Sequence, residues 1–217
     1  MRVRLLLLAV LAAAVSTGAA LGAARPVRPS DGPLLARAPT HEEQIAEAVA
    51  GRLTHRAVTV RCGPLGVAGA GWPSGVAGIT LFTGDRPAGY AILLPQVCAQ
   101  LVAFRRDPSA YDPASCGDSA CFVSVQEAAM ALGTVTHESY HLLGFRTESK
   151  VECYGMQSIW YAATKLGASV QLGEAIARFY ATVVYPQRRV MTPAYWSAEC
   201  RNGGKLDLRK NDPNWPS

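Results

Sequence analysis

The sequence of 217 residues predicts an α+β domain, in which a small, largely antiparallel sheet packs on one long helix and a helical C-terminal part follows. Three observations indicate this fold class. Short alternating segments rich in β-branched residues occupy the first half of the chain. The longest helical pattern comes after them, over residues 123–143. Six cysteines, an even number, provide disulfides that would brace the fold.

The chain begins with the order of residues that marks an export signal. Arg2 and Arg4 precede an unbroken apolar run, and small residues continue to Ala24. This order predicts a signal peptide over residues 1–24 with cleavage near Ala24, and a retained membrane anchor is the alternative. We therefore expect a secreted or extracytoplasmic protein that has no membrane segment once it is processed.

The rest of the chain is expected to form a short flexible segment and one domain. Residues 25–39 are rich in Pro, Arg and Ala without an apolar period, which predicts a flexible N-terminus. Residues 40–217 are enough for a single domain with its own core, expected to be a monomer. The formal net charge of +5 is spread without a basic run, so no nucleic-acid partner is expected.

The domain is expected to open with a helix, because Thr40 and Glu43 form a capping box and apolar residues follow at helical spacing. Three short strands should come next, at residues 57–62, 76–82 and 90–94. The Gly-rich stretch over residues 63–75 predicts a loop between the first two strands. The connection between the last two is rich in turn residues and typical of a hairpin.

Helical patterns dominate the second half of the chain. Helices are expected at residues 96–105, 123–143, 148–166 and 170–184. Gly144 should end the longest of them, at a position where a left-handed residue is commonly needed. From Pro186 onward, Pro, Gly, Asn and Asp predict a loop-like tail with at most a short extended piece at residues 206–208.

All six cysteines follow the export signal, which favours three disulfides over free thiols. Cys116 and Cys121 flank a tight loop and are expected to pair locally. The other predicted pairs are Cys62–Cys98 and Cys153–Cys200. A cysteine metal site is disfavoured, because the chain has no Cys-x-x-Cys pair.

His137, Glu138 and His141 form an H-E-x-x-H motif within the longest predicted helix. Residues four apart project from one face of a helix, so the two imidazoles can meet at a single metal ion. Glu138 then lies where a carboxylate can take a proton from a metal-activated water. The motif predicts a zinc site with Glu138 as general base. The alternative is a pair of ordinary helix histidines.

A catalytic zinc normally takes three protein ligands and leaves one position open. Glu148 and Glu152 follow the motif four residues apart, and therefore lie on one face of the next helix. Either carboxylate can reach the same ion after the turn at Gly144. The other two histidines, His41 and His55, lie at the edges of the first helix and are expected to be solvated.

The motif and the residues after it resemble the gluzincin branch of the zincin metallopeptidases, in which a glutamate on a second helix completes the zinc site. That branch uses Glu-x-x-x-Asp, and Glu-Ser-Lys-Val-Glu at residues 148–152 is similar to it. The resemblance implies a zincin-like fold, with Glu148 as third ligand and Glu152 as the partner that orients His137. The reverse assignment stays open, because Glu replaces Asp and the connection is short. A metzincin would need a ligand at Thr147, which is not a ligand of that type.

The chain as a whole is also similar to a family of secreted proteins of high-GC bacteria. Glu-Cys at residues 152–153 and the ending over residues 199–208 carry this likeness. A peptidase needs a group that stabilises the oxyanion, often Tyr or His. Tyr140, Tyr154 and Tyr161 lie near the motif in sequence, and sequence assigns the role to none of them.

Together these features predict a secreted zinc metallopeptidase, a hydrolase that cleaves a peptide or protein substrate with Glu138 as general base. The strand at residues 90–94 could be the sheet edge that pairs with the extended substrate. Two alternatives stay open. One is a secreted zinc-binding protein without hydrolytic activity, and the other is a disulfide-stapled envelope protein in which the motif occurs by chance.

Overall fold

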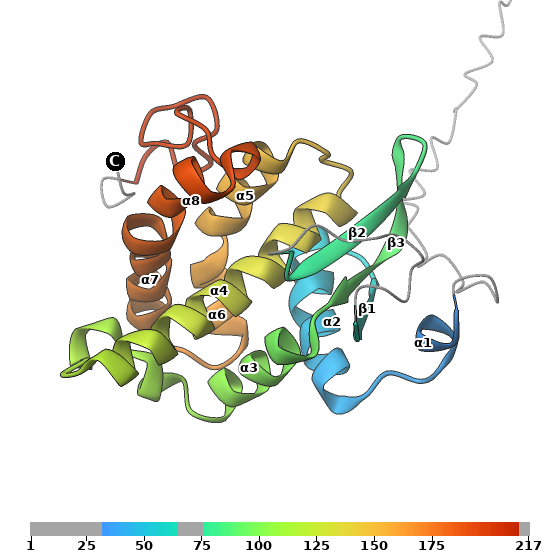
Figure 1. Cartoon of the computed structure of the whole chain (residues 1–217), viewed down its shortest axis with the longest axis horizontal. Coiled ribbons are helices and arrows are strands. Elements are labelled where there is room, and N and C mark those ends of the chain that lie inside the picture. Colours follow the sequence, from blue (N-terminus) through green and yellow to red (C-terminus); the bar gives the residue numbers. More distant parts are fainter. Residues whose placement is uncertain (1–31, 65–75, 213–217) are drawn as a thin grey trace, which may run out of the picture.

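The long helix α4 (Ser119–Leu142) runs through the middle of the structure, a computed structural model in which residues 32–64 and 76–212 are described (Figure 1). The strands lie on one side of α4 and the last helices of the chain on the other. The predicted α+β class is confirmed. Residues 1–31 and 65–75 lie outside the described part, and with them the predicted signal peptide, the start of the predicted flexible segment and most of the Gly-rich stretch.

The described part begins with two helices. The short helix α1 (Pro33–Ala36) falls within the segment predicted to be flexible, and its Leu35 is buried. The helix α2 (His41–Thr54) begins with the predicted capping box. The Thr40 hydroxyl accepts a hydrogen bond from Glu43 N, and the Glu43 carboxylate accepts one from Thr40 N at 2.7 Å.

Three strands form one sheet in the order β1, β3, β2. Their bounds are Thr59–Cys62 for β1, Gly78–Thr83 for β2 and Arg86–Leu93 for β3. Strands β2 and β3 form the predicted antiparallel hairpin, but β1 pairs with β3 in parallel. The sheet is therefore mixed and not largely antiparallel. The reason is that β1 pairs with β3, which is not the next strand along the chain. No tight turn joins the two strands, so no turn imposes an antiparallel direction.

The strand order also corrects the expected sheet edge. The strand predicted at residues 90–94 is part of β3, which lies in the centre with a neighbour on each side. The edge strand that borders α4 is β2. Any extended ligand that pairs with the sheet beside α4 would therefore meet β2.

The connection from the sheet to α4 is helical. The helix α3 (Pro95–Arg106) is followed by two short 3-10 turns, at Pro108–Tyr111 and Pro113–Ser115. Helix α4 begins earlier than predicted, because Asp118 Oδ1 accepts a hydrogen bond from Cys121 N at 2.8 Å and caps the helix.

The three predicted disulfides are all present. The pairs are Cys62–Cys98, Cys116–Cys121 and Cys153–Cys200. The first links β1 to α3, the second closes the loop before α4, and the third ties the C-terminal segment to the helix that follows α4. Disulfides of this kind are typical of proteins that fold in an oxidising compartment.

The C-terminal part is helical as predicted, but its bounds differ. Its elements are α5 (Glu148–Gln157), α6 (Ile159–Lys165), α7 (Val170–Phe179), a π-helical turn (Tyr180–Val184), α8 (Tyr185–Met191) and a 3-10 turn (Pro193–Tyr195). The helix predicted over residues 148–166 is divided at Ser158. The chain at Pro186 continues as α8 and not as a loop, because proline is tolerated in the first turn of a helix. Residues 206–208 form no strand.

Apolar side chains pack around α4 on several sides. Fully buried examples from four helices are Phe104, Leu132, Ile159 and Ile176. Burying such a side chain contributes about 1.5–3 kcal/mol relative to leaving it exposed. This packing holds the backbone of α4, on which the H-E-x-x-H motif lies. Within the described residues, no helix has the length and apolar character needed to cross a membrane.

Candidate metal centre

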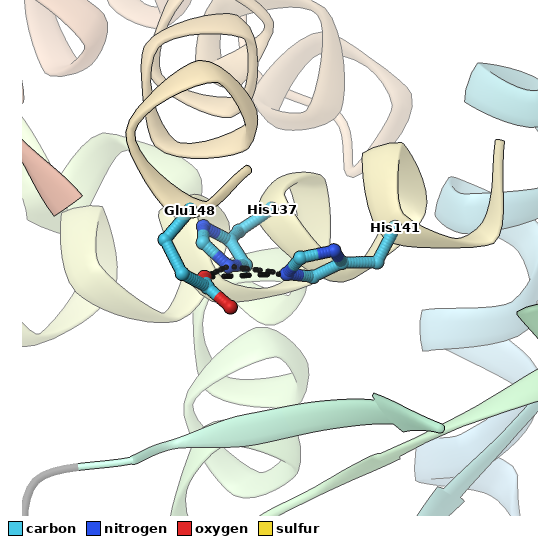
Figure 2. Close-up of side chains that lie close together, drawn as sticks. All are labelled: His137, His141 and Glu148. Atoms are coloured by element: carbon cyan, nitrogen blue, oxygen red, sulfur yellow. Dashed lines mark hydrogen bonds and ion pairs between the residues drawn. The ribbon is translucent and has the colours of Figure 1, made fainter. Parts of the chain in front are cut away.

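The motif lies near the end of α4, and His137, Glu138 and His141 are all buried there. The Nε2 atoms of the two histidines are 3.1 Å apart. Glu148, the first residue of α5, directs Oε2 to the same point, 3.1 Å from His137 Nε2 and 3.3 Å from His141 Nε2. Figure 2 shows the three side chains converging from two helices, with a strand of the sheet crossing below them.

A tight turn brings the second helix back onto the first. Gly144 takes a φ of 98°, the left-handed conformation expected at this position. Its backbone nitrogen donates a hydrogen bond to His141 O at 2.8 Å, which closes the end of α4. Helix α5 then starts at Glu148 and packs along α4. The short connection after His141 is thus long enough to deliver Glu148 to the histidines.

Each histidine is held through its other ring nitrogen. His141 Nδ1 donates to Phe145 O at 2.8 Å, since a carbonyl can only accept. His137 Nδ1 lies 2.9 Å from Glu152 Oε2 and donates to it. When the rings are neutral, these bonds leave the lone pairs of both Nε2 atoms facing Glu148. The two bonds therefore fix the tautomer that a metal ligand needs.

Three ligand atoms meet at this point, within 4.8 Å of one another, and could hold a metal ion. Ligands about 2.0–2.2 Å from a tetrahedral ion lie roughly 3.3–3.5 Å from one another. The observed separations of 3.1–3.3 Å are close to that value. Two imidazole lone pairs and one carboxylate oxygen repel one another unless a cation or protons lie between them.

Negative charge is in excess around the histidines. Glu138, Glu148 and Glu152 border them, and the basic side chain of Arg188 bonds to Glu152. Burial alone lowers the pKa of His137, but hydrogen bonds to Glu148 and Glu152 outweigh burial and raise the pKa to about 10. Burial also acts to raise the pKa of Glu148, but hydrogen bonds from both histidines lower it to about 2. The site therefore attracts positive charge, either protons or a cation.

Glu138 lies between the motif histidines and the edge strand β2. Its Oε2 accepts a hydrogen bond from the Thr80 hydroxyl at 2.9 Å. A Cβ atom at Gly78 would lie 2.9 Å from Glu138 Cγ, so glycine lets β2 approach this closely. Burial raises the pKa of Glu138 above its usual range. A carboxyl group in this environment has a greater affinity for protons than an exposed one.

Glu152 lies on the other side of His137 from the meeting point of the ligand atoms. Its Oε1 accepts hydrogen bonds from the Tyr180 hydroxyl at 2.6 Å and from Arg188 Nε at 3.1 Å. Burial acts to raise the pKa of Glu152, but hydrogen bonding to His137 outweighs it, so the pKa lies below the usual range. Glu152 thus bonds to the outer ring nitrogen of His137, and Glu148 is the carboxylate that faces both histidines.

Tyr195 covers one face of His137. Their ring centroids are 5.4 Å apart and the planes are inclined by 27°. Burial and the nearby negative charge of Glu148 raise the pKa of Tyr195 to about 12. Sequence reasoning missed Tyr195, as it missed Arg188, because both lie beyond Pro186 in the stretch predicted to be a loop-like tail.

Two cavities border the motif. One of about 160 Å³ lies between α4 and the C-terminal segment, and the other, of about 330 Å³, lies against β2 and Glu148. His137, Glu138 and Tyr195 line both of them. A molecule bound across the two cavities would therefore pass the three ligand atoms.

The other residues considered from sequence lie elsewhere. His41 and His55 are exposed at the two ends of α2. The Tyr140 hydroxyl bonds to Ser158 Oγ, and its ring packs on Tyr154. Tyr161 of α6 contacts Lys165. None of these tyrosines is among the described residues that line the two cavities.

Comparison of the chain with protein-family models, with curated proteins and with solved structures finds no match in any of the three. The class of protein is therefore defined by the fold and the site. This is an α+β chain with three disulfides, and it carries a His137, His141 and Glu148 cluster that is compatible with an H-E-x-x-H metal site.

Proposed function

We propose that the protein is an extracytoplasmic zinc metallopeptidase of the gluzincin type, which hydrolyses peptide bonds with Glu138 as general base. The observation that carries the proposal is the convergence of His137 Nε2, His141 Nε2 and Glu148 Oε2 on one point beside a buried carboxylate. Each component has a definite part in hydrolysis.

The donor set favours zinc. Two imidazole nitrogens and one carboxylate oxygen are a set that catalytic zinc sites use, with a fourth position left open. Structural zinc sites are instead closed by four protein ligands, and within the described residues the cluster comprises three. Once both histidines are neutral, as metal ligands must be, Glu138, Glu148 and Glu152, offset by Arg188, leave two negative charges, which a divalent ion would neutralise. Zinc, when bound, lowers the pKa of water and polarises a carbonyl group.

Glu138 is placed to move the proton. The Thr80 hydroxyl donates a hydrogen bond to one of its carboxylate oxygens, and the two cavities that Glu138 lines leave room for water and substrate. Its raised pKa suits a group that takes a proton from the attacking water and passes it to the leaving amine. Burial between β2 and α4 fixes its position during both transfers.

Tyr195 is the candidate for the group that stabilises the oxyanion. It lines both cavities, and it has a pKa of about 12, so the phenol stays protonated at neutral pH and can donate a hydrogen bond. A neutral donor aimed at developing negative charge is the arrangement that acyl transfer requires. Stacking on His137 holds the Tyr195 ring close to the ligand atoms.

The edge strand β2 is the candidate docking surface for an extended peptide. It pairs with β3 on one side, and Gly78, Ile79, Thr80 and Phe82 of β2 line the cavity that contains His141 and Glu148. A peptide added to this edge would run past Glu138. The three disulfides and the predicted signal peptide support a location outside the cytoplasm.

The test is to purify the protein from an oxidising host and measure its metal content and its peptidase activity on a mixed peptide library. We expect about one zinc per chain and cleavage that a chelator abolishes and zinc restores. A protein that binds zinc but cleaves no peptide would support the alternative of a zinc-binding protein without hydrolytic activity. A protein that binds no metal would show that the H-E-x-x-H motif occurs by chance.

A further inference from the structure

We propose that Tyr180 and Arg188 are positioning residues for the candidate metal centre: through Glu152 they hold His137 in the orientation that a metal ion requires. The inference rests on the proposed metal site, but it does not depend on the hydrolytic activity. It arises from the C-terminal helical segment, which no sequence motif connects with the histidines.

Glu152 is the link between this segment and His137. Its Oε2 accepts from His137 Nδ1 at 2.9 Å, and its Oε1 accepts from the Tyr180 hydroxyl at 2.6 Å and from Arg188 Nε at 3.1 Å. The carboxylate cannot rotate without breaking all three bonds. Glu152 is 4% exposed, so water does not replace a lost partner. Its orientation is therefore set jointly by Tyr180 and Arg188.

The π-helical turn explains how these two donors reach one carboxylate. Tyr180 and Arg188 are eight residues apart. In a regular helix that spacing would separate their directions by about 80° around the axis. The π-turn at Tyr180–Val184 takes up one extra residue, which reduces the separation to about 20°. Arg188 Nη2 accordingly lies 3.3 Å from the Tyr180 hydroxyl.

A glycine on the motif helix makes room for the first of these donors. Gly133 lies one helical turn before His137, and a Cβ atom there would be 2.6 Å from Tyr180 Cε2. The Tyr180 ring thus packs directly against the backbone of α4. The helix that carries the motif and the π-turn that carries Tyr180 are therefore in close contact at Gly133.

Arg188 also reaches His137 by a second route. Its guanidinium lies 5.6 Å from the centre of the Tyr195 ring, and that ring stacks on His137. Glu152 holds the His137 ring through a hydrogen bond to Nδ1, and Tyr195 holds it by stacking on its face. Both routes pass through Arg188, so the C-terminal segment constrains the position and the tilt of the ring.

The alternative is that Tyr180 and Arg188 only stabilise the packing of the C-terminal segment. That role predicts a lower melting temperature in variants but no change at the metal. Metal affinity and ligand geometry separate the two roles, because they report the state of His137 directly. The variants should preserve charge, since removing a positive charge would by itself favour binding of a cation.

The test uses Tyr180→Phe and Arg188→Lys in the full mature chain, at a temperature where circular dichroism shows each variant to be folded. The matched controls are Tyr185→Phe, which removes a buried hydroxyl that bonds to the Ser197 backbone, and Arg189→Lys, which changes an exposed neighbour. The readouts are the Kd for Zn²⁺, from competition with a chromophoric chelator, and the visible spectrum of bound Co²⁺.

We expect Tyr180→Phe and Arg188→Lys each to weaken Zn²⁺ binding about tenfold, the low end of the range for residues that support metal ligands, and to alter the Co²⁺ spectrum. Both controls should stay within about twofold of the wild type. Unchanged affinity and spectrum in Tyr180→Phe and Arg188→Lys would overturn the positioning role and leave the metal site intact. A wild-type chain that binds no divalent ion would overturn both. Zinc binding without peptide cleavage would defeat only the peptidase proposal.

Discussion

A Cβ atom at Gly155 would lie 2.9 Å from the backbone nitrogen of His137, closer than real Cβ contacts come. Helix α5 therefore touches α4 at the residue that supplies the first histidine. We predict that Gly155→Ala pushes the two helices apart and moves Glu148 away from the histidines. Overpacking of this kind costs about 1–3 kcal/mol, which at least offsets the roughly 1 kcal/mol that alanine gains over glycine in helix propensity. Thermal unfolding and zinc titration measure both effects.

Gly117→Ala is the matched control, because a Cβ atom at Gly117 meets no heavy atom within 4 Å. Its melting temperature and zinc affinity should stay close to those of the wild type. If Gly155→Ala behaved like Gly117→Ala in both measurements, the close contact between α4 and α5 would have no bearing on the site.

Replacing the proposed general base should separate metal binding from catalysis. Glu138→Gln keeps the size of the side chain and its contact with Thr80 but cannot take a proton. We predict that the variant retains zinc and that its kcat falls by about 10²-fold or more. Glu127→Gln, on an exposed position of the same helix, makes the same charge change away from the motif and should keep full activity. Undiminished cleavage by Glu138→Gln would exclude Glu138 as the base.

The parts of the site that sequence predicts are those fixed by local geometry. Spacing of four residues on a helix brings His137 and His141 together, and a left-handed Gly144 returns the chain to deliver Glu148. The capping box at Thr40 has the same local origin. Each depends on residues within one or two turns, so the pattern alone is enough to place it.

The parts that sequence misses depend on contacts between distant segments. The parallel pairing of β1 with β3 is set by the crossover between them and not by a turn. The residues from Pro186 onward have the composition of a loop, and this pattern gives no sign that Arg188 and Tyr195 lie near the histidines. A π-helical turn has no composition signal, and packing against Gly133 stabilises it only in the folded chain.

Zinc binding should release a proton at neutral pH. His137 has a pKa of about 10 in the metal-free protein, so it is protonated at pH 7, whereas a metal ligand must be neutral. The apparent affinity should therefore rise with pH, by up to about tenfold per unit, until the pH approaches 10. Calorimetry in two buffers of different ionisation enthalpy counts the protons, and binding at pH 7 without proton release would contradict the raised pKa.

The same shift affects the stability of the metal-free fold. Because the pKa of His137 is raised from the ordinary value of 6.5, its protonated form stabilises the fold fully below pH 6.5. That contribution is lost as the pH rises towards 10. Chemical unfolding of the metal-free protein at pH 6 and pH 9 should show this decrease, and zinc should diminish it.

Tyr195→Phe tests the candidate oxyanion donor. The variant keeps the ring that stacks on His137 but loses the hydroxyl, so zinc affinity should change little. We predict a fall in kcat of about 10²-fold, the effect of removing one donor from an oxyanion site. Tyr161→Phe on α6 is the control, because Tyr161 lines neither cavity. A Tyr195→Phe variant with the wild-type kcat would leave this function to another group.

The disulfide Cys153–Cys200 should matter more to the site than Cys116–Cys121. Cys153 follows Glu152 directly, and the bond ties the segment that carries Tyr195 to α5. The two bonds span 47 and 5 residues, so in the chain-entropy picture their removal costs about 4 and about 2 kcal/mol. We predict that replacing both cysteines of the longer pair with alanine lowers the melting temperature more and also weakens zinc binding. The shorter pair should affect stability alone, and equal zinc affinities in the two double variants would show that the longer bond does not support the metal centre.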